Sequence, residues 1–204
     1  MNLNDFFFSY RTLIKSQIEK KNFIKALSKL FSFPYKFLLF KIKIFLNINK
    51  INVDKIIGLD SNDLNKLFVY FNTDKGSEVK IVNKIQKGHN YSAHYEKYLS
   101  KFKNNDVIKI LEIGSLLGSG TASFIKYFQN SKIVSLDINP FNMRYYSKKI
   151  RSIFIDTQSK NIINELAHYI KDDFDIIIDD GSHNKRDQIL TLNYFLPKLK
   201  KKGI

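Results

Sequence analysis

The chain has 204 residues with a hydrophobic fraction of 44% and an aromatic fraction of 14%, so it can form one ordinary domain with a core, and disorder throughout is excluded. Its 34 basic and 19 acidic residues give a formal net charge of +15. This charge favours phosphate-bearing partners or an anionic membrane surface, although a general bias towards Lys, Ile and Asn would produce the same value without any function. The absence of cysteine excludes disulfides and thiolate chemistry.

No stretch of the sequence approaches the ~18 uninterrupted apolar residues of a transmembrane helix. The first ten residues carry Asp5 and no basic residue, unlike a secretory signal peptide. We therefore expect a cytoplasmic protein.

Residues 1–66 are rich in lysine and aromatic residues, and Glu19 is the only acidic residue between Asp5 and Asp54. Apolar residues recur at helical spacing over Phe23–Phe31, with lysines elsewhere on the helical wheel. This pattern predicts a basic amphipathic helix.

We expect Pro34 to interrupt this helix. Basic amphipathic helices with exposed aromatic residues can lie in a membrane interface. Covering a domain or forming a dimer contact is the commoner role, and we favour that interpretation. Residues 1–66 are thus predicted to be a mostly helical extension, and residues 67–204 the main domain.

From about residue 106, apolar strands alternate with amphipathic helices. The expected strands are 107–113, 132–136, 153–155 and 174–178, and the expected helices are 119–128, 161–170 and 185–199, with Pro197 in the last turn. This alternation predicts a parallel sheet covered on both faces, which is a doubly wound, Rossmann-like α/β fold with its first four strands present. Each strand is followed by a glycine or an aspartate: Gly114, Asp137, Asp156 and Asp179. Ligands bind at this carboxyl edge of an open parallel sheet.

The segment 110–121 has the pattern of a strand, a glycine-rich turn and a helix start. Three glycines let the backbone of the turn approach a ligand closely: Gly114, Gly118 and Gly120. Their spacing differs from that of dinucleotide-binding loops. Glu112 suits a cationic group, and Asp137 is placed to accept the hydroxyls of a ribose. S-adenosylmethionine, which has an ammonium, a sulfonium and a ribose diol, fits these residues better than NAD.

A second group of polar residues follows the fourth strand: Asp179, Asp180 and His183. These residues could hold a divalent cation and place a base next to it. The plainer alternative is that the two aspartates cap the next helix and that His183 is solvated.

Several motifs occur in one order: Thr73–Gly76, His89–Tyr98, Leu111–Gly120, Asp137, Asp156–Ser159 and Phe174–His183. Together they resemble the macrocin and mycinamicin O-methyltransferases, metal-dependent class I enzymes that methylate sugar hydroxyls. The resemblance covers roughly residues 68–204 and leaves the first 66 residues outside it.

The resemblance implies a role for each matching residue. The methionine end of S-adenosylmethionine is assigned to Glu112, Gly114, Ser115, Gly118 and Gly120, the ribose to Asp137, and the adenine side to Asp156 and Gln158. Asp179 is also counted with the cofactor site, and Tyr91 and Tyr95 match a segment that closes over the cofactor. Asp180 is implied as a Mg²⁺ ligand, and His183 as the general base that takes the proton of the acceptor hydroxyl.

The family's other metal carboxylates follow a fifth strand, and this chain ends at Ile204, where that strand should begin. We therefore expect an incomplete, C-terminally truncated copy of a longer enzyme. Its fourth strand would be an unpaired sheet edge, and with Asp180 as the only family ligand its affinity for metal should be poor.

The predicted function is an S-adenosylmethionine- and Mg²⁺-dependent O-methyltransferase that acts on a sugar hydroxyl of a glycosylated natural product or a surface-polysaccharide precursor. Two alternatives stay open. The charge could indicate a nucleic-acid-binding protein or RNA methyltransferase, although no RNA-binding module is visible, or the chain could bind cofactor with impaired catalysis. The expected partners are a small-molecule or glycan substrate, a peripheral membrane contact through the basic amino terminus and a second copy of the chain; nucleic acid is not expected.

Overall fold

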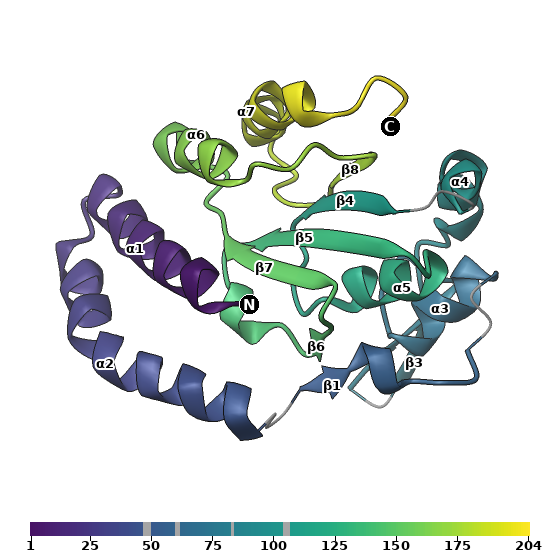
Figure 1. The fold of residues 1–204 in the computed structure, drawn as a ribbon, viewed down its shortest axis with the longest axis horizontal. Helices are drawn as coiled ribbons and strands as arrows, with labels where there is room; N and C mark the ends of the chain where they lie inside the picture. The colour runs from purple at the N-terminus through teal and green to yellow at the C-terminus, as the bar shows by residue number, and fades with distance from the viewer. Residues whose placement is uncertain (47–49, 60–61, 83, 104–106) are drawn as a thin grey trace.

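The computed structural model describes residues 1–46, 50–59, 62–82, 84–103 and 107–204, apart from the side chains of residues 43–46. Its centre is a parallel sheet whose strands are hydrogen-bonded in the order β7 (Ile150–Phe154), β5 (Ser131–Asp137), β4 (Ile108–Ile113) and β8 (Ile176–Asp179). Figure 1 shows this sheet with helices on either side. The four strands predicted from the apolar runs are confirmed, and β7 begins a few residues earlier than expected.

Two hydrophobic cores lie on opposite faces of the sheet, because successive side chains of a strand point to opposite sides. Ile108 and Ile110 belong to the core formed with α3 (Leu64–Tyr70), α4 (Ser92–Leu99) and α5 (Ser119–Tyr127). Leu111 and Ile113 belong to the core formed with α1 (Leu3–Glu19), α6 (Lys160–Tyr169) and α7 (Lys185–Phe195). The fold is therefore the predicted doubly wound α/β arrangement.

Several short elements were not predicted. A two-residue parallel pair joins β1 (Ile51–Asn52) to β6 (Tyr145–Tyr146), and a hairpin joins β2 (Glu78–Ile81) to β3 (Lys84–Lys87). Pro197 lies in a 3-10 turn, Leu196–Lys198, directly after α7, so it ends this helical segment as expected.

The prediction that Pro34 interrupts the amino-terminal helix is wrong. Helix α2 (Phe23–Leu46) runs through Pro34 and curves around α1 (Figure 1). Proline removes one backbone donor, but packing on α1 holds both halves of α2. Before the proline, the Tyr10 hydroxyl donates to the Lys29 carbonyl at 2.7 Å; after it, the ring of Phe40 stacks on Phe6 at 4.2 Å. Neither this helix nor any other in the described part of the chain is long and apolar enough to cross a bilayer.

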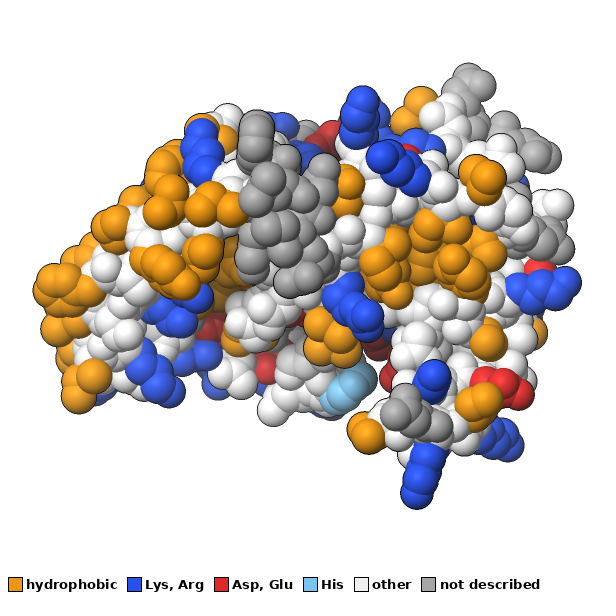
Figure 2. All heavy atoms as spheres, turned by 90° about the horizontal axis from the view of Figure 1, so that it is seen from below, with side chains coloured by type: hydrophobic (Ala, Val, Ile, Leu, Met, Phe, Trp, Pro, Cys, Tyr) orange, Lys and Arg blue, Asp and Glu red, His pale blue; other side chains and the backbone are white. Residues whose placement is uncertain are grey.

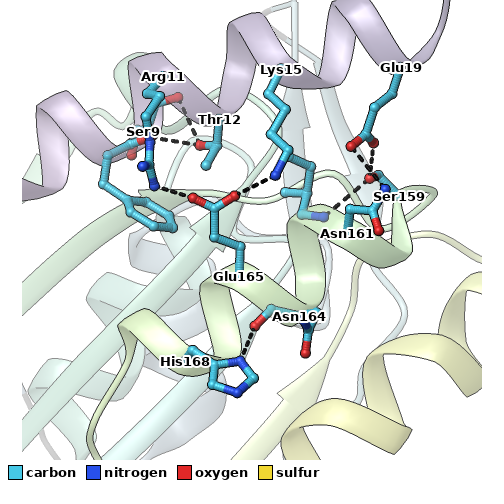
Figure 3. A network of polar contacts seen from close by, with 12 residues as sticks. Ser9, Arg11, Thr12, Lys15, Glu19, Ser159, Asn161, Asn164, Glu165 and His168 are labelled. Carbon is cyan, nitrogen blue, oxygen red and sulfur yellow. Dashed lines mark hydrogen bonds and ion pairs between the residues drawn. The ribbon is translucent and has the colours of Figure 1, made fainter.

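Helix α1 packs against β7 and α6 and covers this part of the domain. The role favoured for the basic helix at Phe23–Phe31 concerns α2 and stays a prediction. The Ser9 hydroxyl accepts the backbone N–H of Phe154 at 2.9 Å, and the fully buried Asp5 carboxylate pairs with Arg151 at 2.9 Å. Polar side chains also join α1 to the α6 region (Figure 3): Arg11 and Lys15 pair with Glu165, and Glu19 accepts from Ser159 and Asn161. The proposed domain boundary near residue 66 stays a prediction.

The fourth strand, β8, is the edge strand of the sheet, as predicted, but part of its outer side is paired. The last residues of the chain lie alongside β8: Ile177 donates to the Ile204 carbonyl at 2.8 Å, and Ile204 donates to the Asp175 carbonyl at 3.0 Å. Just before β8, Phe174 forms a parallel bridge with Leu199. These hydrogen bonds occupy backbone groups that would otherwise face water at a sheet edge.

Candidate cofactor-binding site

A cavity of about 620 Å³ lies where the loops that follow β4, β5, β7 and β8 meet the turn at residues 72–75. Its volume is typical of sites for small molecules and cofactors. Nine of the predicted site residues line it: Glu112, Gly114, Ser115, Gly120, Asp137, Asp156, Gln158, Asp180 and His183. The carboxyl ends of the parallel strands thus bring these residues together, as expected.

The turn after β4 is tightly packed against the loop after β8. Gly114 has φ +82°, a left-handed conformation that side chains disfavour, and a Cβ atom there would clash with the backbone of Asp180 and Gly181. Gly120, in the first turn of α5, touches the carboxylate instead: a Cβ atom there would lie 2.6 Å from Glu112 Oε1. Glycine at these positions lets the two loops and the carboxylate come together.

Glu112 is a buried carboxylate at the wall of the cavity, with an exposed fraction of 1%. Its side chain lies on the same face of β4 as those of Ile108 and Ile110, which is the α5 side of the sheet. Its carboxylate accepts a hydrogen bond from the Thr121 hydroxyl. Burial raises the pKa of Glu112 to about 7, although Thr121 and the ammonium of Lys75 act in the opposite direction. A cationic ligand group would stabilise the ionised form.

Lys75 is a site residue that the sequence interpretation missed. Its side chain is buried, lines the cavity and pairs through Nζ with the Asp180 carboxylate. Its Cε atom lies 3.9 Å from the point where a Cβ of Gly120 would be, beside Glu112. Burial alone would lower the pKa of Lys75, but the hydrogen bond and charge of Asp180, with the charge of Glu112, raise it. The ammonium is therefore held in its charged form.

Asp137 ends β5 at the middle of the cavity, and each of its carboxylate oxygens accepts one backbone N–H. Oδ2 accepts from Leu116 at 2.7 Å, and Oδ1 accepts from Asn139 at 2.8 Å. Each oxygen has a second lone pair, so the carboxylate can still accept hydroxyl groups of a ligand. The two amides fix its orientation.

Asp156, predicted on the adenine side, is held by helix α1. It accepts the Ser16 hydroxyl at 2.5 Å and pairs with Lys20 at 2.7 Å, and its other oxygen accepts the backbone N–H of Gln158 at 3.1 Å. Burial would raise the pKa of Asp156, but the hydrogen bonds from Lys20 and Ser16 lower it overall. Asp156 therefore anchors the loop, and Gln158 is the more exposed side chain at this end of the cavity.

The other predicted site residues do not line the cavity. Gly118 forms the left-handed N-cap of α5, and Asp179 accepts the Thr191 hydroxyl at 2.5 Å, which fixes the loop after β8. Tyr95 packs edge-on against Phe68, and its burial raises its pKa to about 12. Tyr91 is half exposed, and its backbone N–H donates to the Lys75 carbonyl at 2.8 Å, which ties the start of α4 to the site.

Asp180 and His183 both face the cavity from the loop after β8. His183 lines the cavity and is exposed to solvent. The alternative that the aspartates cap the next helix is wrong: the cap of α7 is Asn184, whose side chain accepts the backbone N–H of Arg186 at 2.9 Å.

Comparisons with known proteins indicate a methyltransferase. Residues 111–204 match a family model described as a methyltransferase domain. The chain is 26% identical over 123 residues to an 8-demethyl-8-alpha-L-rhamnosyl tetracenomycin-C 2'-O-methyltransferase of Streptomyces olivaceus, a match that covers 57% of this chain and 32% of the relative.

Among solved structures, the fold is similar to that of the MycE methyltransferase from the mycinamycin biosynthetic pathway in complex with Mg and SAH. The TM-score is 0.55 at 23% identity, over 69% of this chain and 38% of that one. The complex of MycE with Mg, SAH and mycinamycin VI matches with the same TM-score and identity, over 37% of its length. The chain thus spans about a third of the length of these relatives. Its residues 111–204 match the methyltransferase-domain model, its fold is similar to that of the MycE methyltransferase, and its sequence is similar to that of a sugar O-methyltransferase.

Proposed function

We propose that the chain binds S-adenosylmethionine in this cavity and transfers its methyl group to a sugar hydroxyl. One observation carries the proposal: the side chains of Glu112 and Lys75 are both buried, and the Glu112 carboxylate and the Lys75 Cε atom lie within 4 Å of one point, the Cβ position of Gly120. An amino-acid group has one ammonium and one carboxylate, so these two side chains match its charges in a place where water competes little. The first backbone amides of α5 favour the ligand's carboxylate as well.

The remaining cavity residues fit the rest of the cofactor. Asp137 can accept the ribose hydroxyls, and the loop at Gln158 lies beyond it, where the adenine is expected. When bound, the cofactor supplies an electrophilic methyl group on a positively charged sulfur. The acceptor oxygen would form the new C–O bond as the C–S bond breaks, and the exposed His183 imidazole would take the hydroxyl proton.

Mg²⁺ is present in the MycE structures, but the described residues do not fit a magnesium site on their own. No group of three His, Cys, Asp or Glu side chains within the described ranges could hold a metal ion. Of the two aspartates predicted to hold a cation, Asp180 is paired with Lys75 and Asp179 accepts the Thr191 hydroxyl. We therefore assign no step to the metal, and its use by the whole protein stays a proposal, as do the acceptor class and a cytoplasmic location.

Calorimetric titration tests the cofactor proposal directly. The chain should bind S-adenosylmethionine and SAH, which share the amino-acid end and the ribose, and should not bind NAD comparably. Failure to bind S-adenosylmethionine at millimolar concentration would refute the proposal for this chain. Binding of RNA that weakens steeply with salt, together with no cofactor binding, would favour the nucleic-acid alternative instead.

Replacing His183 by alanine should slow methyl transfer by ~10²–10⁴-fold, the typical contribution of general-base catalysis to rate. The affinity for the cofactor should change by less than about twofold. Single-turnover assays with a panel of glycosylated acceptors would measure transfer, and calorimetry would measure binding. His168, which lies on α6 and bonds the Asn164 carbonyl, offers a control (Figure 3): His168→Ala should leave both quantities unchanged. Unchanged turnover in His183→Ala would remove the base assignment.

Replacing Lys75 by methionine should weaken binding of S-adenosylmethionine by about tenfold to a hundredfold, since a charge-assisted hydrogen bond is worth about 1.5–3 kcal/mol. Adenosine has no amino-acid group, so its affinity should be unaffected. Lys87→Met, on the exposed strand β3, is the matched control. An equal loss of affinity for adenosine would show that Lys75 supports the cavity as a whole and does not contact the amino-acid end.

A further inference from the structure

Helix α2 is apolar on two opposite sides. Its inner side packs on α1, where the rings of Phe33, Phe37 and Phe40 lie 6.3, 5.9 and 4.2 Å from the ring of Phe6. This packing accounts for one apolar face of an ordinary surface helix. The apolar residues of the other side are largely exposed.

The outer side carries a continuous stripe of large apolar residues. Its members, with their exposed fractions, are Ile24 (83%), Leu27 (53%), Phe31 (80%), Tyr35 (61%), Leu38 (57%) and Ile42 (38%). Their spacing of three or four residues places them along one line of the helix, over about 27 Å at 1.5 Å per residue. Figure 2 shows apolar side chains gathered on the left end of the molecule, which α1 and α2 form. We call these six residues the outer stripe.

The charge around the outer stripe has one sign. Lys25, Lys36 and Lys41 are exposed on α2, and the sequence has no acidic residue between Glu19 and Asp54. Lys25 and Lys36 lie on one side of the stripe and Lys41 on the other, by the 100° rotation per residue of a helix. Lysines at the borders of an apolar face can extend their ammonium groups into a polar layer while their carbon chains stay with the apolar residues.

A second cavity, of about 600 Å³, opens beside the same lysine side of α2. It lies between α1, α2 and the segment 139–148 and is lined by Lys29, Lys36 and Lys148 together with aromatic rings such as Phe40 and Phe141. A cavity lined by lysine ammonium groups and aromatic rings suits a molecule with an anionic headgroup and an apolar chain, such as an anionic lipid.

We propose that α2 docks the protein on an anionic lipid membrane, lying in the plane of the interface with its outer stripe among the acyl chains and its lysines at the headgroups. Helices that bind in this way combine an apolar face with a lysine-rich border and do not cross the bilayer. A second copy of the chain fits less well, because pairing two outer stripes would bring lysines against lysines without a carboxylate on either helix. The proposal does not depend on the methyl-transfer reaction.

Sedimentation with vesicles tests the docking. The chain should pellet with vesicles that contain about a third phosphatidylserine, should bind pure phosphatidylcholine vesicles at least tenfold more weakly, and should lose most of the binding in high salt. Phe31→Asp combined with Ile24→Asp should lower binding at least tenfold by placing charge in the stripe. Lys25→Glu combined with Lys36→Glu and Lys41→Glu should lower it at least as much, but only for the anionic vesicles.

The control is Ile57→Asp combined with Val82→Asp, which adds the same two negative charges at residues outside α2 that are 90% and 89% exposed. This variant should bind like the wild type. Circular dichroism would show that each variant keeps its fold. Two results would overturn the proposal: wild type that stays in the supernatant with anionic vesicles, or stripe variants that pellet as well as wild type. A dimer in vesicle-free solution that Phe31→Asp converts to monomer would also overturn it, and would assign the stripe to a second copy.

Discussion

Replacing Gly114 by alanine should destabilise the fold by about 3 kcal/mol or more. Gly114 has φ +82°, and an L-residue in the left-handed region costs roughly 1–2 kcal/mol. Its new methyl group would also clash with backbone atoms of Asp180 and Gly181, and forcing extra atoms into a packed site typically costs another ~1–3 kcal/mol. These atoms follow β8 directly, so the clash can be relieved only by moving that strand or the turn after β4. Urea unfolding followed by circular dichroism would measure the loss.

Gly58 provides a matched control for this experiment. It has nearly the same backbone angle, φ +78°, but a Cβ atom there would meet nothing within 4 Å. Gly58→Ala should therefore cost only the conformational strain, roughly 1–2 kcal/mol. If both variants lost the same stability, the close contact between the loops after β4 and β8 would be disproved, and with it the shape of this side of the cavity.

The parts of the site that could be predicted are those set by local sequence. An apolar run followed by a glycine or an aspartate identifies the end of a buried strand, and parallel strands place their ends at one edge. Glu112, Asp137 and Asp180 could therefore be assigned to one cavity without a structure. Their positions follow from three strands that are continuous in sequence.

Contacts between distant parts of the chain could not be predicted in this way. Lys75 meets Asp180 across 105 positions. Its place in the motif Thr73–Gly76 sets it apart from other lysines, but the motif does not identify its partner. Ser16 and Lys20 reach Asp156 from a segment that lies outside the family resemblance. A tight turn that contains a lysine, such as residues 73–76, can equally lie on a solvated surface. The Lys75 side chain is buried only because of tertiary packing.

Pro34 illustrates a different limit of sequence interpretation. The helix-breaking tendency of proline is a local preference of about 3 kcal/mol, and packing can offset it. Aromatic rings on both sides of Pro34, among them Phe33 and Phe37, pack against Phe6 of α1 and keep the helix continuous. The relevant partner, Phe6, lies 28 positions away from Pro34 and belongs to another helix.

Binding of S-adenosylmethionine should tighten as the pH rises towards 7, and this dependence should disappear in Glu112→Gln. Burial raises the pKa of Glu112 to about 7, so below that pH the free site holds a protonated, neutral carboxyl. An ammonium ligand favours the ionised form, and binding must then release the proton. The affinity should rise by up to tenfold per pH unit below about 7 and level off above it.

The free energy of unfolding of the cofactor-free protein should fall as the pH rises towards 7, whereas the affinity for the cofactor rises. Because the pKa of Glu112 is raised from 4.5 to about 7 on folding, its contribution to stability is fully present below pH 4.5 and is lost as the pH rises through 7. The shift corresponds to a contribution on the order of 3 kcal/mol. Glutamine has the shape of glutamate without its charge, so the unfolding free energy of Glu112→Gln should not fall in this way as the pH rises. The affinity of this variant for the cofactor should be low at every pH.

Calorimetry and urea unfolding between about pH 5.5 and 8 would measure both trends in the wild type and in Glu112→Gln. A slope of affinity against pH that persisted in Glu112→Gln would show that another group is responsible. A flat profile in the wild type would mean that the amino-acid ammonium does not meet Glu112, and the orientation of the cofactor proposed for this cavity would have to be abandoned.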